Sequence, residues 1–194
     1  MSERAVRRAT YEDVLAAPPH MIAEIIAGEL RLQPRPAKPH AAAASALGEE
    51  LGPPFKRGKG GPGGWIILDE PELHLGEDVV VPDLAGWRRT TMPELVADVP
   101  YFTVVPDWIA EVVSPATEKY DRTDKLSLYR AQKVGWAWLV DPLQRTLEVL
   151  RNDDDGWTLR GTWRDEATPR AEPFDAIELD LSALWADVVL PAQR

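Results

Sequence analysis

Two acidic residues stand inside segments that otherwise have the apolar character of buried strands. Asp83 follows three valines and a proline in "VVVPDLAGW", and Glu111 lies at the centre of "PDWIAEVVSP". A carboxylate is rarely buried without a partner, because its removal from water is costly. Two carboxylates that converge near the ends of neighbouring strands would form a site of hard oxygen ligands, which is the kind that Mg²⁺ prefers.

The strand pattern indicates where each acid points. Side chains alternate between the two faces of a strand, so Asp83 falls on the face of Val81, and Glu111 falls on the face of Ile109 and Val113. The proline before Asp83 cannot donate to a sheet ladder, which predicts that this acid lies near a strand end or a sheet edge. Both carboxylates are therefore expected on apolar faces, where a charge needs a partner or a function.

Each of these residues also has an ordinary structural interpretation. An aspartate after proline is typical of a turn, which is the alternative role of Asp83. Glu111 could instead form a buried ion pair, with Lys125 as the candidate partner. Lys125 is otherwise expected to be a solvated helix residue paired with Asp121, and Asp121 is expected to cap that helix.

The composition describes a globular chain and excludes several chemistries. The 194 residues are 44% hydrophobic and 28% charged, with a net charge of −10. There is no cysteine, which excludes a thiol nucleophile, thiolate zinc ligands and disulfides. No apolar segment is long enough to span a membrane and the first residues lack a signal-peptide core, so we expect a cytoplasmic protein. The length predicts a single domain over residues 1–194, with its core at about 21–185.

The order of predicted elements is mixed α/β. Caps, glycines and prolines bound the expected helices, which are 11–17, 40–51, a helix from about 121 to 134, and a short one at the end of the chain. Apolar runs and turn residues bound the expected strands, which are 21–26, 29–33, a hairpin of 65–75 with 79–87, 108–113, 136–141, 145–151, 157–163 and a last strand near 177–181. This order predicts central strands flanked by helices.

The ordered set of segments resembles the Uma2 family of endonucleases, within the PD-(D/E)xK nuclease superfamily. The resemblance rests on "VPDLAGW", "IAEVVSP", "DRTDKLSLY" and "KVGWAWLVDP", together with the early "AEIIAGEL" and the closing "IELDLSALW". It covers nearly the whole chain, from about residue 24 to 184. It implies a restriction-endonuclease-like core, with a central mixed β-sheet flanked by helices, and metal-dependent hydrolysis of phosphodiester bonds.

By position in the motifs, the resemblance implies that Asp83 is the acid of "PD" and Glu111 the acid of "(D/E)xK". Both would be ligands of Mg²⁺ or Mn²⁺. The lysine of the second motif should stand two residues after Glu111, but Val113 occupies that place. The family pattern offers Lys125, on the following helix, as the cation that would orient the attacking water or offset charge on the phosphate. Valine cannot do this, so catalysis depends on Lys125 reaching the site.

Further residues of the candidate site come from the N-terminal part of the chain. His40, which follows a proline at the start of the first long helix, is a candidate to bind the substrate phosphate or to move a proton. Its ordinary role would be capping or surface exposure. Nucleases of this kind often use a third acid from the N-terminal segment. Glu24, which lies among apolar residues, is the preferred candidate, and Glu29 is the alternative.

These features predict a Mg²⁺-dependent endonuclease that acts on DNA. The net charge of −10 opposes this prediction, because affinity for phosphate rests mainly on lysine and arginine. The glycine-rich loop with Lys56, Arg57 and Lys59 would supply a local phosphate clamp, although a solvated loop is its ordinary interpretation.

Two other classes of function compete with the endonuclease. The alternative is a non-catalytic nucleic-acid-binding or regulatory module that keeps the nuclease fold, which Val113 and the acidic charge favour. A glycoside hydrolase would also use two acids, but the order of the motifs opposes it. For the endonuclease, a homodimer is expected by analogy with nucleases of this fold that pair to cut both strands.

Overall fold

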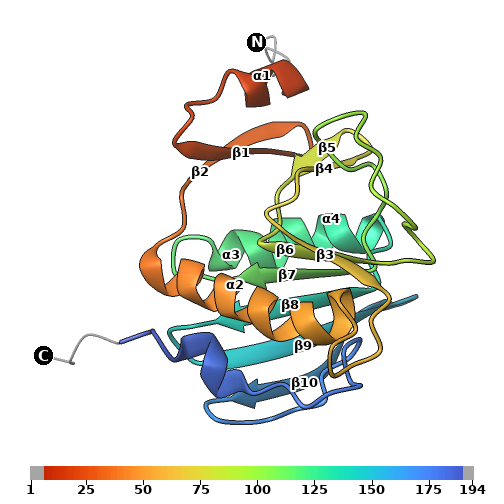
Figure 1. Ribbon diagram of the computed structural model, residues 1–194. Coiled ribbons are helices and arrows are strands. Elements are labelled where there is room, and N and C mark those ends of the chain that lie inside the picture. Colours follow the sequence, from red (N-terminus) through yellow and green to blue (C-terminus); the bar gives the residue numbers. More distant parts are fainter. Residues whose placement is uncertain (1–6, 190–194) are drawn as a thin grey trace, which may run out of the picture.

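The computed structural model describes residues 7–189 and is built around two β-sheets (Figure 1). In the smaller sheet all neighbouring strands are antiparallel, in the order β2-β1-β5-β4. Its strands are β1 (Met21–Ile26), β2 (Glu29–Pro34), β4 (Leu73–Leu75) and β5 (Asp78–Val80). Ala27 and Gly28 form the tight turn between β1 and β2, and both have positive φ, which matches the right-handed twist of a hairpin.

The larger sheet has six strands in the order β10-β9-β8-β7-β6-β3. Only β7 and β8 are parallel among the neighbouring pairs of this sheet, so the sheet is mixed. Its strands are β3 (Trp65–Asp69), β6 (Leu84–Arg88), β7 (Trp108–Val112), β8 (Trp136–Asp141), β9 (Thr146–Asp153) and β10 (Gly156–Arg164). Parallel neighbours need a crossover connection, and here the crossover from β7 to β8 is helical.

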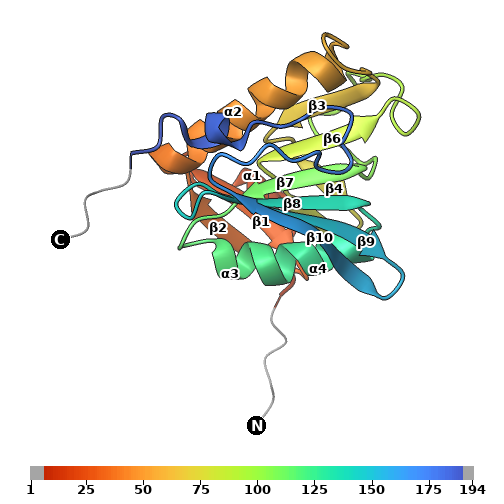
Figure 2. The ribbon, with the colours of Figure 1, turned by 90° about the horizontal axis from the view of Figure 1, so that it is seen from below.

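Helices cover both faces of the larger sheet. Figure 2 shows α2 (Lys38–Leu51) on one side and α3 (Glu118–Tyr120) with α4 (Leu126–Ala131) on the other. A π-helical turn at Asp121–Lys125 joins α3 to α4. The remaining helical segments are α1 (Tyr11–Leu15), a π-helical turn at Gly52–Lys56 and a 3₁₀ helix at Leu181–Trp185. The prediction of a mixed central sheet flanked by helices is confirmed.

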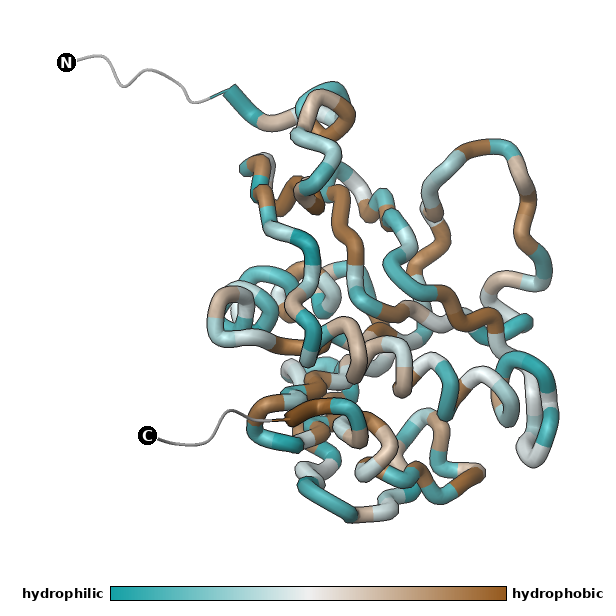
Figure 3. The backbone as a smooth tube through the Cα atoms, turned by 60° about the vertical axis from the view of Figure 1, so that its left-hand side comes forward, coloured by the Kyte–Doolittle hydropathy of each residue, from teal (hydrophilic) through white to brown (hydrophobic). Residues whose placement is uncertain are grey.

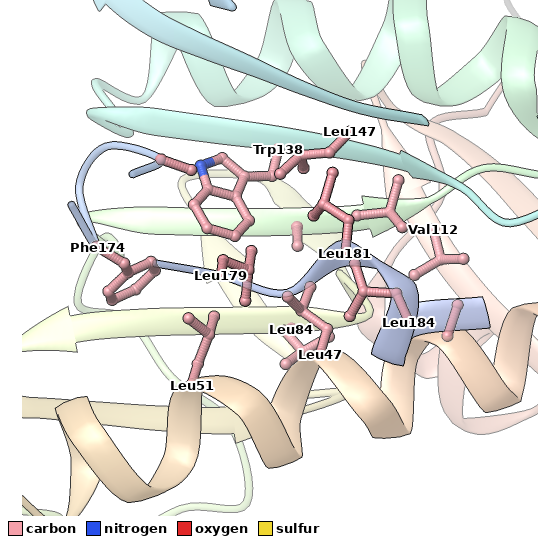
Figure 4. Packing of buried hydrophobic residues seen from close by; sticks show 14 of the residues in the cluster. Leu47, Leu51, Leu84, Val112, Trp138, Leu147, Phe174, Leu179, Leu181 and Leu184 are labelled. Carbon is pink, nitrogen blue, oxygen red and sulfur yellow. The ribbon is translucent and has the colours of Figure 1, made fainter. Parts of the chain in front are cut away.

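The alternation along β7 divides the core into two parts. Trp108 and Val112 face the cluster under α2, whereas Ile109 and Val113 face the cluster under α4, as the sequence pattern predicts. Figure 4 shows the first cluster, where side chains of the sheet meet those of α2 and of the C-terminal segment. Figure 3 shows hydrophobic stretches running through the middle of the molecule. Glu111 lies on the α4 side, inside the second apolar cluster.

The single hairpin predicted for 65–75 and 79–87 is wrong. Each half divides between the two sheets: β3 pairs with β6 in the larger sheet, and β4 pairs with β5 in the smaller one. The breaks fall at Pro71 and Pro82, because proline has no N–H to continue a ladder. Asp83 therefore lies in the short connection between β5 and β6. It does not lie on one continuous strand with the valines that precede it.

Two further predicted elements differ from the structure. The helix expected from Asp121 begins at Glu118, so Asp121 lies inside it and is not its cap. The segment around 177–181 forms no strand in the described chain, because Asp180 caps the 3₁₀ helix by accepting from the Ser182 N–H. A run that alternates apolar and acidic residues therefore packs as irregular chain against the core.

Phe174 lies at the centre of an aromatic cluster, and its removal is expected to destabilise the fold. Its ring lies 4.6 Å from that of Phe55, 4.7 Å from Trp65 and 4.9 Å from Trp108. Phe174→Ala should lower the free energy of unfolding by about 3–5 kcal/mol, the usual cost of deleting a buried phenyl ring. Urea unfolding would measure this, with Phe174→Leu as a control that costs less. Equal stability of the alanine variant would contradict the packing described here.

Candidate active site

Asp83 and Glu111 line one cavity of about 150 Å³. Glu111 lies near the C-terminal end of β7, and Asp83 lies just before β6, the antiparallel neighbour of β7. The N–H of Val112 donates to Asp83 Oδ2 at 2.7 Å, which fixes the aspartate beside the strand that carries Glu111. The cavity therefore lies where the chain passes between the two sheets.

Lys125 supplies a buried cation to this cavity. Its Nζ lies 3.0 Å from Glu111 Oε1 and 3.1 Å from Glu24 Oε1, and it also donates to the carbonyl oxygen of Val81 at 3.3 Å. Lys125 is 3% exposed, Glu111 2% and Glu24 0%. The lysine and the two acids come from a helix and from strands of both sheets. The ion pair therefore joins the small sheet to the large one.

Neutral donors complete the surroundings of the two buried acids. The Tyr129 hydroxyl donates to Glu111 Oε1 at 2.6 Å. The Gln33 side-chain amide donates to Glu24 Oε2 at 2.7 Å, and the Val81 N–H donates to Glu24 Oε1 at 2.9 Å. Buried carboxylates are tolerated when their oxygens accept hydrogen bonds and face a cation, and both conditions are met here.

The π-helical turn places two charged residues on the cavity side of the helix. Asp121 and Lys125 stand at its two ends, and both are buried and line the cavity. Turns of this kind occur mostly as single insertions in α-helices and are frequent at functional sites. Their spacing of four residues already places them near one face of a helix, and both side chains line the cavity.

The cavity holds more negative than positive charge, and the pKa values respond to it. Burial raises the pKa of Glu111 well above its ordinary value; Asp121, Asp83 and Glu24 raise it further, while Lys125 lowers it. Burial also raises the pKa of Asp121 to about 6. Burial disfavours the charged form of Lys125, but Glu111 and Glu24 outweigh it and raise its pKa, so the lysine is a cation.

His40 lies in the first turn of α2 and faces the same cavity. Its Nε2 lies 3.2 Å from Asp83 Oδ2, and its side chain is 13% exposed. Its Nδ1 is buried and has no hydrogen-bond partner within the described residues. Since the neutral ring has one donor and one acceptor, the contact with Asp83 favours a proton on Nε2 and leaves Nδ1 as a free acceptor.

The structure brings together five of the predicted residues, namely Asp83, Glu111, Lys125, His40 and Glu24. Other candidates lie elsewhere. Glu29 is on exposed β2, where it pairs with Arg31 at 2.7 Å. The loop with Lys56, Arg57 and Lys59 follows the C-terminal end of α2, which lies about 17 Å along the helix axis from His40. Lys56 donates to the Ile67 carbonyl oxygen at 2.9 Å, so this loop is not a clamp at the cavity.

The sequence interpretation missed three residues of the cavity and its surroundings. Asp121 is predicted as a cap, and the sequence pattern assigns no part in the site to Tyr129 or Gln33. The signal that would identify Tyr129 is its spacing of four residues from Lys125, which places both near the same face of the helix. Asp121 has the same spacing from Lys125, but its place at the expected start of the helix favours a cap or an exposed ion pair.

The donor chemistry of the cavity fits a hard divalent cation. Within residues 7–189 no group of three or more histidine and acidic side chains forms a compact metal cluster. Mg²⁺, however, takes only one or two protein carboxylates and completes its shell with water or phosphate. Asp83 Oδ1 accepts no hydrogen bond from the described residues, whereas Oδ2 has two partners. Asp83 and Glu111 thus supply carboxylate oxygens to a cavity of excess negative charge. Asp83 Oδ1 is the oxygen that has no hydrogen-bond partner among the described residues.

The comparison with solved structures defines the class of fold. A crystal structure described as "a putative nuclease belonging to DUF820 from Anabaena variabilis ATCC 29413" superposes with a TM-score of 0.71 at 20% identity. The match covers 93% of this chain and 99% of that chain. The chain therefore has the restriction-endonuclease-like α/β fold that the order of motifs implies.

The family follows from the sequence itself. A family model described as "Uma2: Putative restriction endonuclease" matches residues 9–183. The chain belongs to the Uma2 family, and this confirms the resemblance described above. The family description indicates a nuclease-like function and a nucleic acid as substrate. A search of curated proteins found no match. In the part of the chain from residue 7 to residue 189, no helix has both the length and the apolar content to cross a bilayer.

Asp121→Asn is expected to flatten the pH dependence of stability in metal-free buffer. The folded-state pKa of about 6 lies above the ordinary 3.8, so the folded chain holds this proton more tightly than the unfolded chain does. The resulting stabilisation is complete below about pH 4 and is lost as pH rises through 6. At about 1.4 kcal/mol per pKa unit, wild type should lose about 3 kcal/mol through this group, and the variant should not.

Urea unfolding at pH 4 and pH 7 would measure the difference. Asp154→Asn, on the exposed turn between β9 and β10, is the matched control and should behave like wild type. The same pH slope in wild type and in Asp121→Asn would show that Asp121 is not held in a protonated form by its surroundings.

Proposed function

We propose that the protein is a metal-dependent, endonuclease-like phosphodiester hydrolase that acts on DNA, with its active site in the cavity of Asp83 and Glu111. The observation that carries the proposal is the position of Lys125, whose ammonium lies 3.0 Å from Glu111 although it comes from another element. The superfamily motif has its lysine two residues after this acid, and here Val113 is buried in the apolar cluster. Lys125 would supply the cation that Val113 lacks.

Asp83 and Glu111 would hold a Mg²⁺ or Mn²⁺ ion. Such an ion, when bound, supplies Lewis-acid polarisation of the phosphate and lowers the pKa of a bound water. Glu24 is the third acid of the proposed site, and it acts through Lys125, with which it shares an ion pair of 3.1 Å. Its complete burial makes it a positioning residue.

Lys125 would act as a fixed positive charge. Its raised pKa keeps it protonated at neutral pH, so it does not accept a proton from water in the resting site. A buried ammonium that is already oriented stabilises negative charge developing on the phosphate oxygens, and it needs no reorganisation to do so. The proton of the attacking water would pass instead to a group at the mouth of the cavity.

His40 is the candidate for that group and for a contact with the substrate phosphate. It lies against Asp83 and is partly exposed, and its Nδ1 has no partner in the described chain. A neutral imidazole has one nitrogen that accepts a proton and one that donates a hydrogen bond, which suits a role at the rim.

The second candidate is a non-catalytic module that keeps the nuclease fold. One observation favours it: both oxygens of Glu111 already face partners, Lys125 and Tyr129, so the acid is satisfied as a structural ion pair. A single measurement distinguishes the two candidate functions, namely cleavage of DNA in the presence of Mg²⁺ or Mn²⁺. Binding of DNA without cleavage under either metal would favour the module.

Asp83→Asn and Glu111→Gln should each abolish metal-dependent cleavage while the chain stays folded. Loss of a group that only supports a metal ligand typically lowers metal affinity or activity 10- to 100-fold. Loss of a ligand itself should therefore lower the cleavage rate more than about 100-fold. A nicking assay on labelled DNA with Mn²⁺ and with EDTA measures cleavage, and circular dichroism checks the fold. Asp154→Asn is the control and should cleave like wild type. Unchanged cleavage in both site variants would remove the proposal.

A further inference from the structure

The proposed catalytic groups are recessed from the surface. Glu24, Glu111 and Lys125 are at most 3% exposed, and Asp83 is the most accessible of the four, with a side chain that is 14% exposed. Duplex DNA is stiff over about 150 base pairs, and both its strands are held in a regular helix. A phosphate of an intact duplex therefore reaches such a recess less readily than a phosphate on a flexible strand. A single strand is flexible and can bend to enter it.

A second cavity adjoins the first. It has a volume of about 230 Å³ and shares part of its wall with the catalytic cavity. The shared wall consists of Gln33, Pro34, Ala116 and Thr117. A ligand that extends from one cavity to the other would pass along this wall. A phosphate and the neighbouring base of one polynucleotide strand are linked closely enough to occupy two adjoining cavities in this way.

The lining of the second cavity suits a nucleobase. Tyr120 supplies an aromatic ring, and the guanidinium of Arg31 lies 5.8 Å from the centre of that ring. Unpaired bases are commonly recognised by stacking on aromatic rings and on guanidinium planes. Leu32, on the edge strand β2, is 43% exposed and adds an apolar side chain to the lining of the cavity.

The net charge of the chain favours contact with a short stretch of nucleic acid over binding of a long duplex. A duplex-binding surface neutralises many phosphates with lysine and arginine, and the net charge of this chain is −10. Arg31 and Arg35 lie at the mouth of the two cavities, and each also pairs with a carboxylate: Arg31 with Glu29 at 2.7 Å and Arg35 with Glu70 at 3.5 Å. Two guanidinium groups that share their charge in this way can contact the phosphates beside one stacked base, but they do not hold a long duplex.

We infer that the site takes single-stranded DNA, with one base in the cavity of Tyr120 and Arg31 and the adjoining phosphodiester in the cavity of Asp83 and Glu111. The inference rests on the proposed function for the position of the phosphate. The base subsite is an additional site, and it can be tested by binding alone, without cleavage.

Fluorescence anisotropy with a 5′-labelled dT 12-mer, in EDTA so that no cleavage occurs, measures binding to the full chain. Wild type should bind this strand at least about tenfold more tightly than a duplex of 12 base pairs. Tyr120→Leu should weaken binding of the strand about tenfold, because base stacking on one ring contributes about that much. Tyr120→Phe keeps the ring and should bind like wild type, which also controls for folding.

Matched controls separate the subsite from general effects. Arg31→Ala should weaken binding of the strand severalfold. Arg160→Ala should not, although Arg160 also pairs with a glutamate, at 2.9 Å, on the edge strand of the other sheet. A 12-residue abasic strand keeps the phosphates and removes the bases. It should bind wild type about as weakly as the dT strand binds Tyr120→Leu.

Equal or tighter binding of the duplex, or no effect of Tyr120→Leu, would overturn the inference. Cleavage of duplex that depends on Asp83 and Glu111, without binding or cleavage of the single strand, would leave the hydrolase proposal standing and remove the single-strand inference. Absence of all cleavage, together with the expected effects of Tyr120 and Arg31 on binding, would support the base subsite and remove the hydrolase proposal.

Discussion

The structure of the site depends on one buried interaction, in which the ammonium of Lys125 lies between Glu111 and Glu24. Burial of three charged groups is costly, and it is tolerated here because the cation faces both acids and because Tyr129 and Gln33 donate to them. Replacement of the lysine alone would leave two carboxylates without a counter-charge. The helix, the small sheet and the large sheet must therefore all be in place for the cavity to keep its form.

The sequence predicts the parts of this arrangement that follow from local patterns. Glu111 stands out because an acid interrupts an apolar strand, and the alternation along 108–113 gives its face correctly. The hairpin at 65–87 was predicted wrongly because strand patterns do not state which sheet a strand joins. Pro71 and Pro82 are local signs of the change of sheet, but a proline by itself predicts only a strand end or a sheet edge, as it does for Pro82.

Long-range parts of the site could not be derived from local patterns. Lys125 was proposed from the family resemblance alone, since a lysine on a helix is ordinarily solvated. Glu24 was chosen for its apolar neighbours, a signal that indicates burial but gives no partner. Asp121 was missed because an aspartate at the expected start of a helix favours a capping role, which gives no sign of burial beside Lys125. The family membership explains why the order of motifs identified the fold although no single motif is specific.

The pairing of Glu24 with Lys125 also bears on how the molecule is made. The two residues are about a hundred positions apart in the chain, and contacts of such separation form late in folding because the intervening loop must close first. During translation, the glutamate leaves the ribosome long before the helix that carries its partner. Nascent chains that end before this helix hold two anionic groups that have no cation to face. The recess between the sheets is thus a property of the finished polypeptide.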